Sequence, residues 1–167
     1  MSESEKNLQA AFAGESQANR KYLAFAKKAD EEGQKGVAKL FRAAAAAETI
    51  HAHNHFDVLG GVKGTLENLK AAYGGEHYEF SEMYPAFLAK AKEENDSKAK
   101  LTFHWANEVE KVHGALYDSA VKALEAGEAF PEKDYYICPK CGYTVGDEAP
   151  DKCPVCGVKK DEFFLAD

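Results

Sequence analysis

Two short phrases of the sequence combine a carboxylate with an imidazole at the same spacing. Glu48 precedes His51 by three residues, and Glu110 precedes His113 by three residues. Each pair falls inside a long stretch of helical periodicity, where residues three apart lie on one face, about one turn from each other. Each pair also falls on the apolar stripe of its helix, where an unpaired carboxylate would be costly to desolvate. Two such pairs have the ligand types and the spacing to hold one metal cluster.

Further carboxylates fall on the apolar stripes of two other helical stretches. Glu15 lies seven residues before Tyr22 on one stripe, and Glu76 lies on another, with Glu79 one turn after it. One Glu from each of two helices and Glu-x-x-His from each of two more is the ligand set of dimetal carboxylate bundles. Carboxylates bridge two ions and imidazoles suit iron. The set predicts an iron pair that exchanges two electrons together, which matches cleavage of one O–O bond.

Four amphipathic helices must position these ligands. Apolar residues at helical spacing predict helices over residues 4–32, 37–59, 65–94 and 96–127, with Gly33, Gly60 and Gly127 as stops and Thr65 as a cap. The four glutamates lie about 11 to 14 residues into their helices, so they would meet at mid-height. The pattern favours a mainly α fold built on a four-helix bundle.

The third helix allows two interpretations. In the first, it begins at Thr65 and continues through Gly74, Gly75 and Pro85, although each glycine costs about 1 kcal/mol and the proline should kink it. In the second, it begins at Gly75 and residues 60–74 are a crossover. The second interpretation would place Glu76 in the first turn, away from mid-height.

A less specific interpretation makes these glutamates solvated helix faces paired with nearby lysines, which is the usual fate of Glu in a helix. Lys21, Lys39 and Lys111 are available as partners. Six matching ligands on four stripes at one depth argue against this interpretation.

All four cysteines follow residue 137, as Cys138-x-x-Cys141 and Cys153-x-x-Cys156. In a reducing compartment, two such pairs indicate a metal knuckle and not two disulfides. Four thiolates form a tetrahedral site for zinc or iron, and their spacing does not choose between the two metals. A structural zinc ribbon is therefore an open alternative. We expect a helical domain over residues 1–130 and a small metal-binding domain over residues 134–167.

Composition excludes several classes of partner. The formal net charge of -7 argues against nucleic acid. No run of 18 apolar residues is present, so no membrane span is expected. The charged beginning lacks the apolar segment of a secretory signal, which predicts a cytoplasmic protein.

With both sites in view, the sequence resembles rubrerythrin, the non-haem di-iron peroxidase of anaerobic and microaerophilic microbes. The resemblance covers nearly the whole chain in the family's usual order. The matching phrases are Gly14-Glu-Ser-Gln-Ala, Ala47-Glu-Thr-Ile-His51, Gly75-Glu-His-Tyr-Glu79, Glu82-Met-Tyr-Pro85, Glu110-Lys-Val-His113 and the rubredoxin-like tail.

The resemblance implies a ferritin-like bundle with two Fe, followed by a rubredoxin-like domain with one Fe(SCys)4 centre that carries single electrons. It implies that the oxidised iron pair is bound by Glu15, Glu48, Glu76, Glu79, Glu110 and His113, and that His51 replaces Glu79 on one iron upon reduction. Tyr22 and Tyr84 match tyrosines near the family's iron pair, where they either hydrogen-bond the ligands or pack as aromatic side chains.

The expected chemistry is reduction of hydrogen peroxide to water, in defence against oxidative stress. Electrons would come from rubredoxin or an NAD(P)H:rubredoxin reductase, because the chain has no nucleotide-binding glycine motif. The first alternative is a ferroxidase that uses O2 and stores iron, and the second is a non-enzymatic scaffold with a zinc ribbon.

The link between the second and third helices predicts a homodimer with exchanged helices. If the third helix starts at Thr65, residues 60–64 reach at most about 18 Å. In a ferritin-like bundle these two helices run parallel, so the link must span about 30 Å. We therefore expect a domain-swapped dimer in which each iron pair takes ligands from two chains.

Overall fold

The computed structural model describes residues 1–166, which form two compact units, one from Met1 to Lys63 and the other from Gly64 onward. The division between them falls inside the segment expected as the helical domain. Among the described residues, no helix is both long and apolar enough to cross a membrane.

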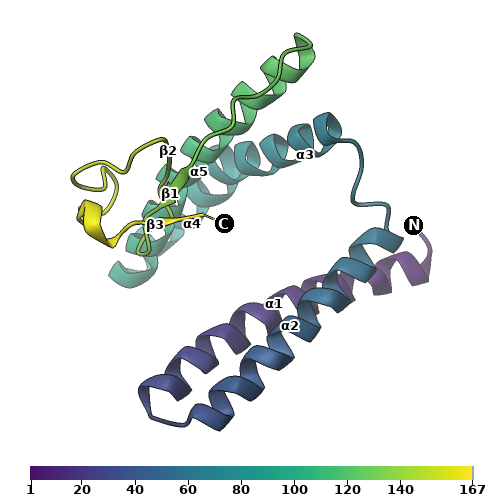
Figure 1. The fold of residues 1–167 in the computed structure, drawn as a ribbon, viewed down its shortest axis with the longest axis vertical. Coiled ribbons are helices and arrows are strands. Elements are labelled where there is room, and N and C mark those ends of the chain that lie inside the picture. The colour runs from purple at the N-terminus through teal and green to yellow at the C-terminus, as the bar shows by residue number, and fades with distance from the viewer. Residues whose placement is uncertain (167) are drawn as a thin grey trace. The chain divides into compact units, whose positions relative to one another are not determined.

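The first unit is a hairpin of α1 (Glu3–Glu31) and α2 (Lys35–Val58), which lie side by side (Figure 1). Ser2 and Glu5 form a capping box at the start of α1, because the side chain of each accepts a hydrogen bond from the other's backbone N–H. Gly33 turns the chain between the helices at φ +75°, a left-handed conformation that favours glycine.

Small residues form the seam of this hairpin. The fully buried side chains of the first unit are all alanines: Ala26, Ala29, Ala38, Ala45 and Ala52. Larger apolar side chains of both helices remain exposed, among them Leu40 at 69%, Ile50 at 60% and Val58 at 72%. The two helices therefore bury little of their own apolar surface.

The second unit begins with a helical stretch that is interrupted by one π-helical segment. It comprises α3 (Thr65–Tyr78), the π-helical segment η1 (Glu79–Met83) and α4 (Tyr84–Glu93). The interpretation that starts this helix at Thr65 is confirmed, and the start at Gly75 is wrong. The expected cap is also wrong, because Gly64 occupies the N-cap position and Thr65 is the first helical residue. Pro85 is accommodated at the first turn of α4, where a missing N–H costs nothing.

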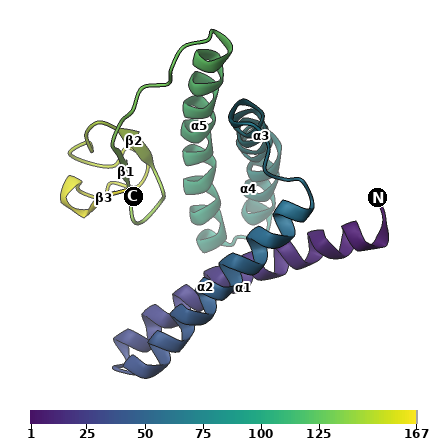
Figure 2. The ribbon, with the colours of Figure 1, turned by 45° about the vertical axis from the view of Figure 1, so that its right-hand side comes forward.

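The helix α5 (Ser97–Glu125) packs along both α3 and α4 (Figure 2). Asp96 caps it, with its carboxylate accepting from the backbone N–H groups of Lys98 and Ala99. Aromatic rings of Tyr84, Phe87 and Phe103 join α4 to α5. The four expected helical stretches are thus confirmed.

A small three-stranded antiparallel sheet follows α5. It consists of β1 (Tyr135–Ile137), β2 (Thr144–Gly146) and β3 (Phe164–Leu165) in the order β2-β1-β3, with the 3-10 turn η2 (Lys160–Glu162) before β3. Gly142 and Gly157, each directly after the second cysteine of a pair, have φ of +85° and +77°. The positive φ turns each knuckle around its sulfur atoms.

Candidate metal centres

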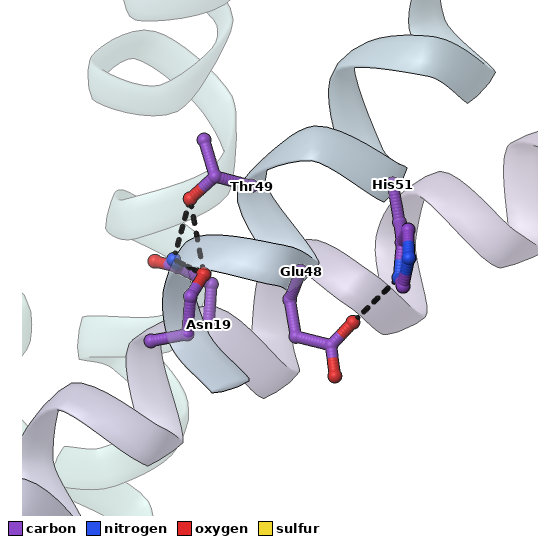
Figure 3. Close-up of polar contacts among 5 residues, drawn as sticks. Asn19, Glu48, Thr49 and His51 are labelled. Carbon is purple, nitrogen blue, oxygen red and sulfur yellow. Dashed lines mark hydrogen bonds and ion pairs between the residues drawn. The ribbon is translucent and has the colours of Figure 1, made fainter. Parts of the chain in front are cut away.

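The α1–α2 hairpin brings together Glu15, Glu48 and His51. One ligand atom from each lies within 4.8 Å of the others. The Nδ1 atom of His51 lies 2.8 Å from Oε2 of Glu48, one turn earlier on α2 (Figure 3). The carboxylate of Glu48 is mostly buried, whereas the His51 side chain is 54% exposed. One Glu and one Glu-x-x-His pair, which are half of the expected dimetal ligand set, therefore lie together in one hairpin.

An amide next to this group fixes the register of the two helices. Asn19, one turn after Glu15, donates from Nδ2 to the carbonyl of Ala45 and to Oγ1 of Thr49, each at 2.8 Å (Figure 3). Thr49 in turn donates to the same carbonyl at 3.1 Å. Because Thr49 adjoins Glu48, these hydrogen bonds hold the two glutamates at one level.

The second unit assembles the matching group from Glu76, Glu110 and His113. Their ligand atoms also lie within 4.8 Å of one another. Nδ1 of His113 lies 2.8 Å from Oε2 of Glu110 and 3.9 Å from Oε1 of Glu76. The His113 side chain is 28% exposed, about half the value for His51. The two Glu-x-x-His pairs thus have the same internal geometry in different surroundings.

The electrostatics of this second group fit a cation. Burial, followed by the negative charge of Glu110, raises the pKa of Glu76 from 4.5 to about 7. Burial and the same charge raise the pKa of Glu79. The hydrogen bond that the carboxylate of Glu110 accepts from the imidazole raises the pKa of His113. Three acids crowded in a partly buried site repel one another, and metal ions would remove this cost and take the hard oxygen ligands.

The π-helical segment begins at Glu79, one turn after Glu76. A π-turn adds one residue to a helical turn and is frequent at functional sites. Glu79 contributes no atom to the three-residue groups, but its charge acts on Tyr84, whose pKa is raised by burial and then by Glu79, Glu110 and Glu76. The charges of these carboxylates therefore reach the hydroxyl of Tyr84.

Tyr22 lies elsewhere on its hairpin, two turns from Glu15. Its ring packs with Phe25 and Phe41, at centroid distances of 6.4 Å and 6.2 Å. Two roles were expected for Tyr22, hydrogen bonding to the ligands and aromatic packing. The described hairpin shows the aromatic packing.

The lysines named as alternative partners do not pair with the clustered glutamates. Lys111 pairs with the exposed Glu108 at 2.6 Å. Within residues 1–166, neither Lys21 nor Lys39 forms an ion pair. The interpretation of the clustered glutamates as lysine-paired helix faces therefore loses its proposed partners.

All four cysteines converge at the tail. Sγ of Cys138 lies 3.4 Å from Sγ of Cys156, and Sγ of Cys141 lies 3.5 Å from Sγ of Cys153. These separations are near the roughly 3.8 Å edge of a tetrahedron with metal–sulfur bonds of about 2.3 Å. All four thiols are free of disulfides.

The backbone around the cysteines favours thiolates at one position. Burial opposes ionisation of Cys138, but hydrogen bonds from the backbone N–H groups of Cys141 and Lys140 outweigh it and lower the pKa of this thiol to about 7. Burial raises the pKa of Cys141. A bound metal supplies the charge that ionises such thiols, so the donor set fits a tetrahedral metal ion.

Known protein families match both the helical part and the tail of the chain. A family model described as rubrerythrin matches residues 6–121, and a model of the rubredoxin-like domain of rubrerythrin matches residues 136–164. The chain belongs to the rubrerythrin family. Membership assigns it a ferritin-like fold with a di-iron site and a rubredoxin-like Fe(SCys)4 domain, as expected.

Named relatives agree along nearly the full length. Rubrerythrin-2 of Clostridium acetobutylicum is 38% identical over 170 residues, covering 93% of this chain and 92% of that protein. Nigerythrin of Nitratidesulfovibrio vulgaris is 40% identical over 173 residues, covering 95% and 84%. The solved structure of fully reduced, all-ferrous nigerythrin matches with a TM-score of 0.59 at 37% identity and covers 99% of this chain and 88% of its own.

The sequence did not single out Thr144, which contacts a predicted ligand. Nε2 of His113 lies 3.0 Å from Oγ1 of Thr144 in β2. The two residues are 31 positions apart, and nothing in the sequence pattern pairs them. Asn19 was missed for the same reason, since its partners lie on the other helix of the hairpin.

Proposed function

We propose that this member of the rubrerythrin family is a reductive peroxidase that converts hydrogen peroxide to two waters. The observation that supports the proposal is the contact between Thr144 and His113, because the proposed electron-carrying Fe(SCys)4 segment then adjoins a proposed di-iron ligand. A protein that only stores iron needs no such electron carrier at each turnover. The proposal makes the chain an oxidoreductase in defence against oxidative stress.

The clustered side chains have distinct proposed roles. When bound, two ferrous ions supply the two electrons that cleave the O–O bond, and two protons complete the waters. Glu15, Glu48, Glu76 and Glu110 would hold and bridge the irons, and His113 would anchor one of them. Glu79 and His51 would be alternative ligands in the oxidised and reduced states. The lack of a hydrogen-bond partner for Nε2 of His51 within the described α1–α2 hairpin supports this role, because a ligand that joins only one state must be free to move.

We propose that the tail passes single electrons from a separate donor through Cys138, Cys141, Cys153 and Cys156. The donor would be rubredoxin or an NAD(P)H:rubredoxin reductase. Four free thiols require a reducing compartment, which supports a cytoplasmic location. We retain the expected boundary between a helical domain over residues 1–130 and a rubredoxin-like domain over residues 134–167.

Rapid mixing under anaerobic conditions tests the activity. The fully reduced protein should be oxidised quickly by hydrogen peroxide and slowly by O2. The variant Glu110→Gln should lose the fast phase, whereas Glu108→Gln, two residues away and paired with Lys111, should keep it. Faster oxidation by O2 than by peroxide would support a ferroxidase instead. Oxidation by neither would support a non-enzymatic scaffold.

We further propose that the complete di-iron site forms in a domain-swapped homodimer. Seven residue steps join Val58 to Thr65 and span at most about 25 Å. Glu48 lies ten residues before the end of α2, and Glu76 lies eleven residues after the start of α3. With α2 and α3 parallel, as in a ferritin-like bundle, bringing these glutamates to one level within one chain would require about 32 Å. Exposed apolar side chains on the hairpin support a partner that covers them.

Complementation between two inactive variants tests the exchange. Glu48→Gln disables the α1–α2 ligands, and Glu110→Gln disables the α5 ligands. In a swapped heterodimer of these two variants, one site combines both substitutions and the other site is intact. Coexpression should therefore restore about a quarter of the wild-type activity. A bundle made from a single chain, including one with α2 and α3 antiparallel, would leave every site defective and the mixture inactive.

A further inference from the structure

The first cysteine knuckle lies along one stripe of α5. Lys140 places Nζ over the ring of Trp105, 5.0 Å from its centroid. A side chain added at Gly142 would meet Val109 at 3.8 Å. Thr144 meets His113 at 3.0 Å.

The spacing of these contacts follows the two backbones. Every second residue of the knuckle, from 140 to 144, meets every fourth residue of α5, from 105 to 113. Residues four apart lie on one face of a helix, so the three contacts of the knuckle follow a single stripe of α5. The knuckle and the helix are therefore in register over two turns of α5, and His113 is the last contact of that register.

The hydrogen bonds of Thr144 determine which atom of His113 donates. Its hydroxyl has a single hydrogen, and Oγ1 donates it to the carbonyl of Gly142 at 3.0 Å. The lone pairs of Oγ1 then face Nε2 of His113, which must carry a hydrogen to bond there. With Nε2 protonated and held, Nδ1 is the ring atom turned toward Glu110 and Glu76.

We propose that Thr144 is a positioning residue for the di-iron site and the hydrogen-bonded link through which electrons leave the knuckle. Its hydroxyl fixes the ring of His113 so that Nδ1 faces Glu110 and Glu76, where it could bind a metal, as outer-shell partners of ligating histidines do. The same hydroxyl bonds the carbonyl of Gly142, the residue after Cys141, so the link from thiolate to imidazole bypasses Tyr143.

The electron step is balanced one electron at a time. The ferrous ion of the Fe(SCys)4 centre becomes ferric as one ferric ion of the di-iron site becomes ferrous, and two such transfers follow each peroxide. An electron-donor protein of the rubredoxin-reductase type restores the first ion. This step rests on the proposed peroxidase function, whereas the positioning of His113 by Thr144 does not.

Metal binding tests the positioning role without any turnover. Protein with a filled cysteine site and empty carboxylate ligands is titrated with cobalt(II), whose carboxylate–imidazole spectrum reports the second site. Thr144→Val, which keeps the shape and removes the hydroxyl, should bind cobalt about 10 to 100-fold more weakly. Thr144→Ser should stay near wild type, and so should Thr102→Val, an exposed threonine of α5.

Single-turnover mixing of the fully reduced protein with one equivalent of hydrogen peroxide tests the link. The visible bands of the ferric cysteine centre appear as its electron leaves. Thr144→Val should slow their appearance at least about tenfold relative to wild type and Thr144→Ser. Unchanged cobalt affinity and an unchanged rate in Thr144→Val would overturn the proposal. Equal losses in the Ser variant would also overturn it, because the hydroxyl would then be irrelevant.

Two further outcomes are distinguishable. Lys140→Gln is the matched control, since this variant removes the contact over Trp105 and leaves the bonds of Thr144 in place. It should transfer electrons at the wild-type rate, and a slowing equal to that of Thr144→Val would overturn the link. If Thr144→Val loses the visible bands of the cysteine centre, Thr144→Ala takes its place with the same expected outcomes. If peroxide fails to oxidise even the wild-type protein, the peroxidase proposal fails while the cobalt titration still decides the role of Thr144.

Discussion

The two Glu-x-x-His pairs differ in whether Nε2 of the imidazole has a hydrogen-bond partner. In each pair, Nδ1 lies 2.8 Å from the carboxylate one turn earlier. Nε2 of His113 is held by Thr144 at 3.0 Å, whereas Nε2 of His51 has no hydrogen-bond partner within its described unit. His51 is also about twice as exposed. The same motif therefore gives one braced imidazole and one free imidazole.

This difference matches the two ligand roles proposed for the histidines. A braced imidazole loses little conformational entropy when it binds a metal ion, so it suits a ligand that stays bound in every state. An imidazole whose Nε2 is not held can rotate between positions, which suits a ligand that joins only after reduction. The three-residue spacing brings the Glu and the His of each pair together. The contacts of Nε2 then determine whether the imidazole stays bound to the metal in every redox state.

Removal of each imidazole should give the largest contrast. His113→Ala should weaken cobalt(II) binding at the carboxylate site more than about 100-fold, because a preorganised ligand is lost, and His51→Ala should weaken it about tenfold or less. His104→Ala, an exposed histidine of α5, serves as the control. Titration followed by visible absorption measures the affinities. Equal losses in the first two variants would show that the two imidazoles are equivalent ligands.

The second group should make the stability of the protein depend on pH, because it contains a glutamate with a strongly raised pKa. The pKa of Glu76 is about 7 in the folded state and about 4.5 in the unfolded chain. Between these values the folded state binds more protons, so the stability of the metal-free protein falls as pH rises. The raised pKa of His113 acts in the same direction above its ordinary value of 6.5.

Thermal unfolding of the metal-free protein between pH 4.5 and 8 checks this dependence. Relative to wild type, Glu76→Gln should lose most of the decline between pH 4.5 and 7. Glu108→Gln gives a control of opposite sign, because Lys111 lowers the pKa of Glu108 and its contribution is lost as pH falls. A decline of the same size in wild type and Glu76→Gln would assign the effect to other groups.

Much of the fold and of both ligand groups could be predicted from the sequence. Helical periodicity puts Glu15 and Glu48 on the apolar stripes of their helices at a similar depth. A spacing of three puts the Glu and the His of each Glu-x-x-His pair on the same face of one helix. Two Cys-x-x-Cys knuckles likewise define their own turns. These features depend on residues close together in the chain, or on one face that repeats every turn.

The remaining features depend on which segments pack together. The hydrogen bond that holds His113 comes from a residue 31 positions later, whereas the same motif at His51 has no such bond within the part of the hairpin that the structure describes. The π-helical turn at Glu79–Met83 was also not predicted, because one extra residue in a turn leaves little trace in an apolar pattern. Differences between two copies of the same motif therefore become visible only in the structure.

Two asparagines extend the comparison of the units to a smaller effect. Nδ2 of Asn19 makes two hydrogen bonds of 2.8 Å across the α1–α2 hairpin. Asn107 in α5 is 7% exposed, and its Oδ1 has no partner among the described residues. Its Nδ2 only reaches Glu108 at 3.5 Å. One amide is satisfied and the other is buried without compensation.

Replacement of each amide by leucine should change stability in opposite directions. Asn19→Leu should destabilise the protein by about 2 kcal/mol, since two hydrogen bonds are lost. Asn107→Leu should be neutral or stabilising by about 1 kcal/mol, because the burial cost of an unpaired carbonyl is removed. Urea unfolding midpoints measure both, with the exposed Asn54→Leu as control. A clear loss in Asn107→Leu would mean that Oδ1 has a hydrogen-bond donor in solution, such as an ordered water, and the two amides would then be equally satisfied.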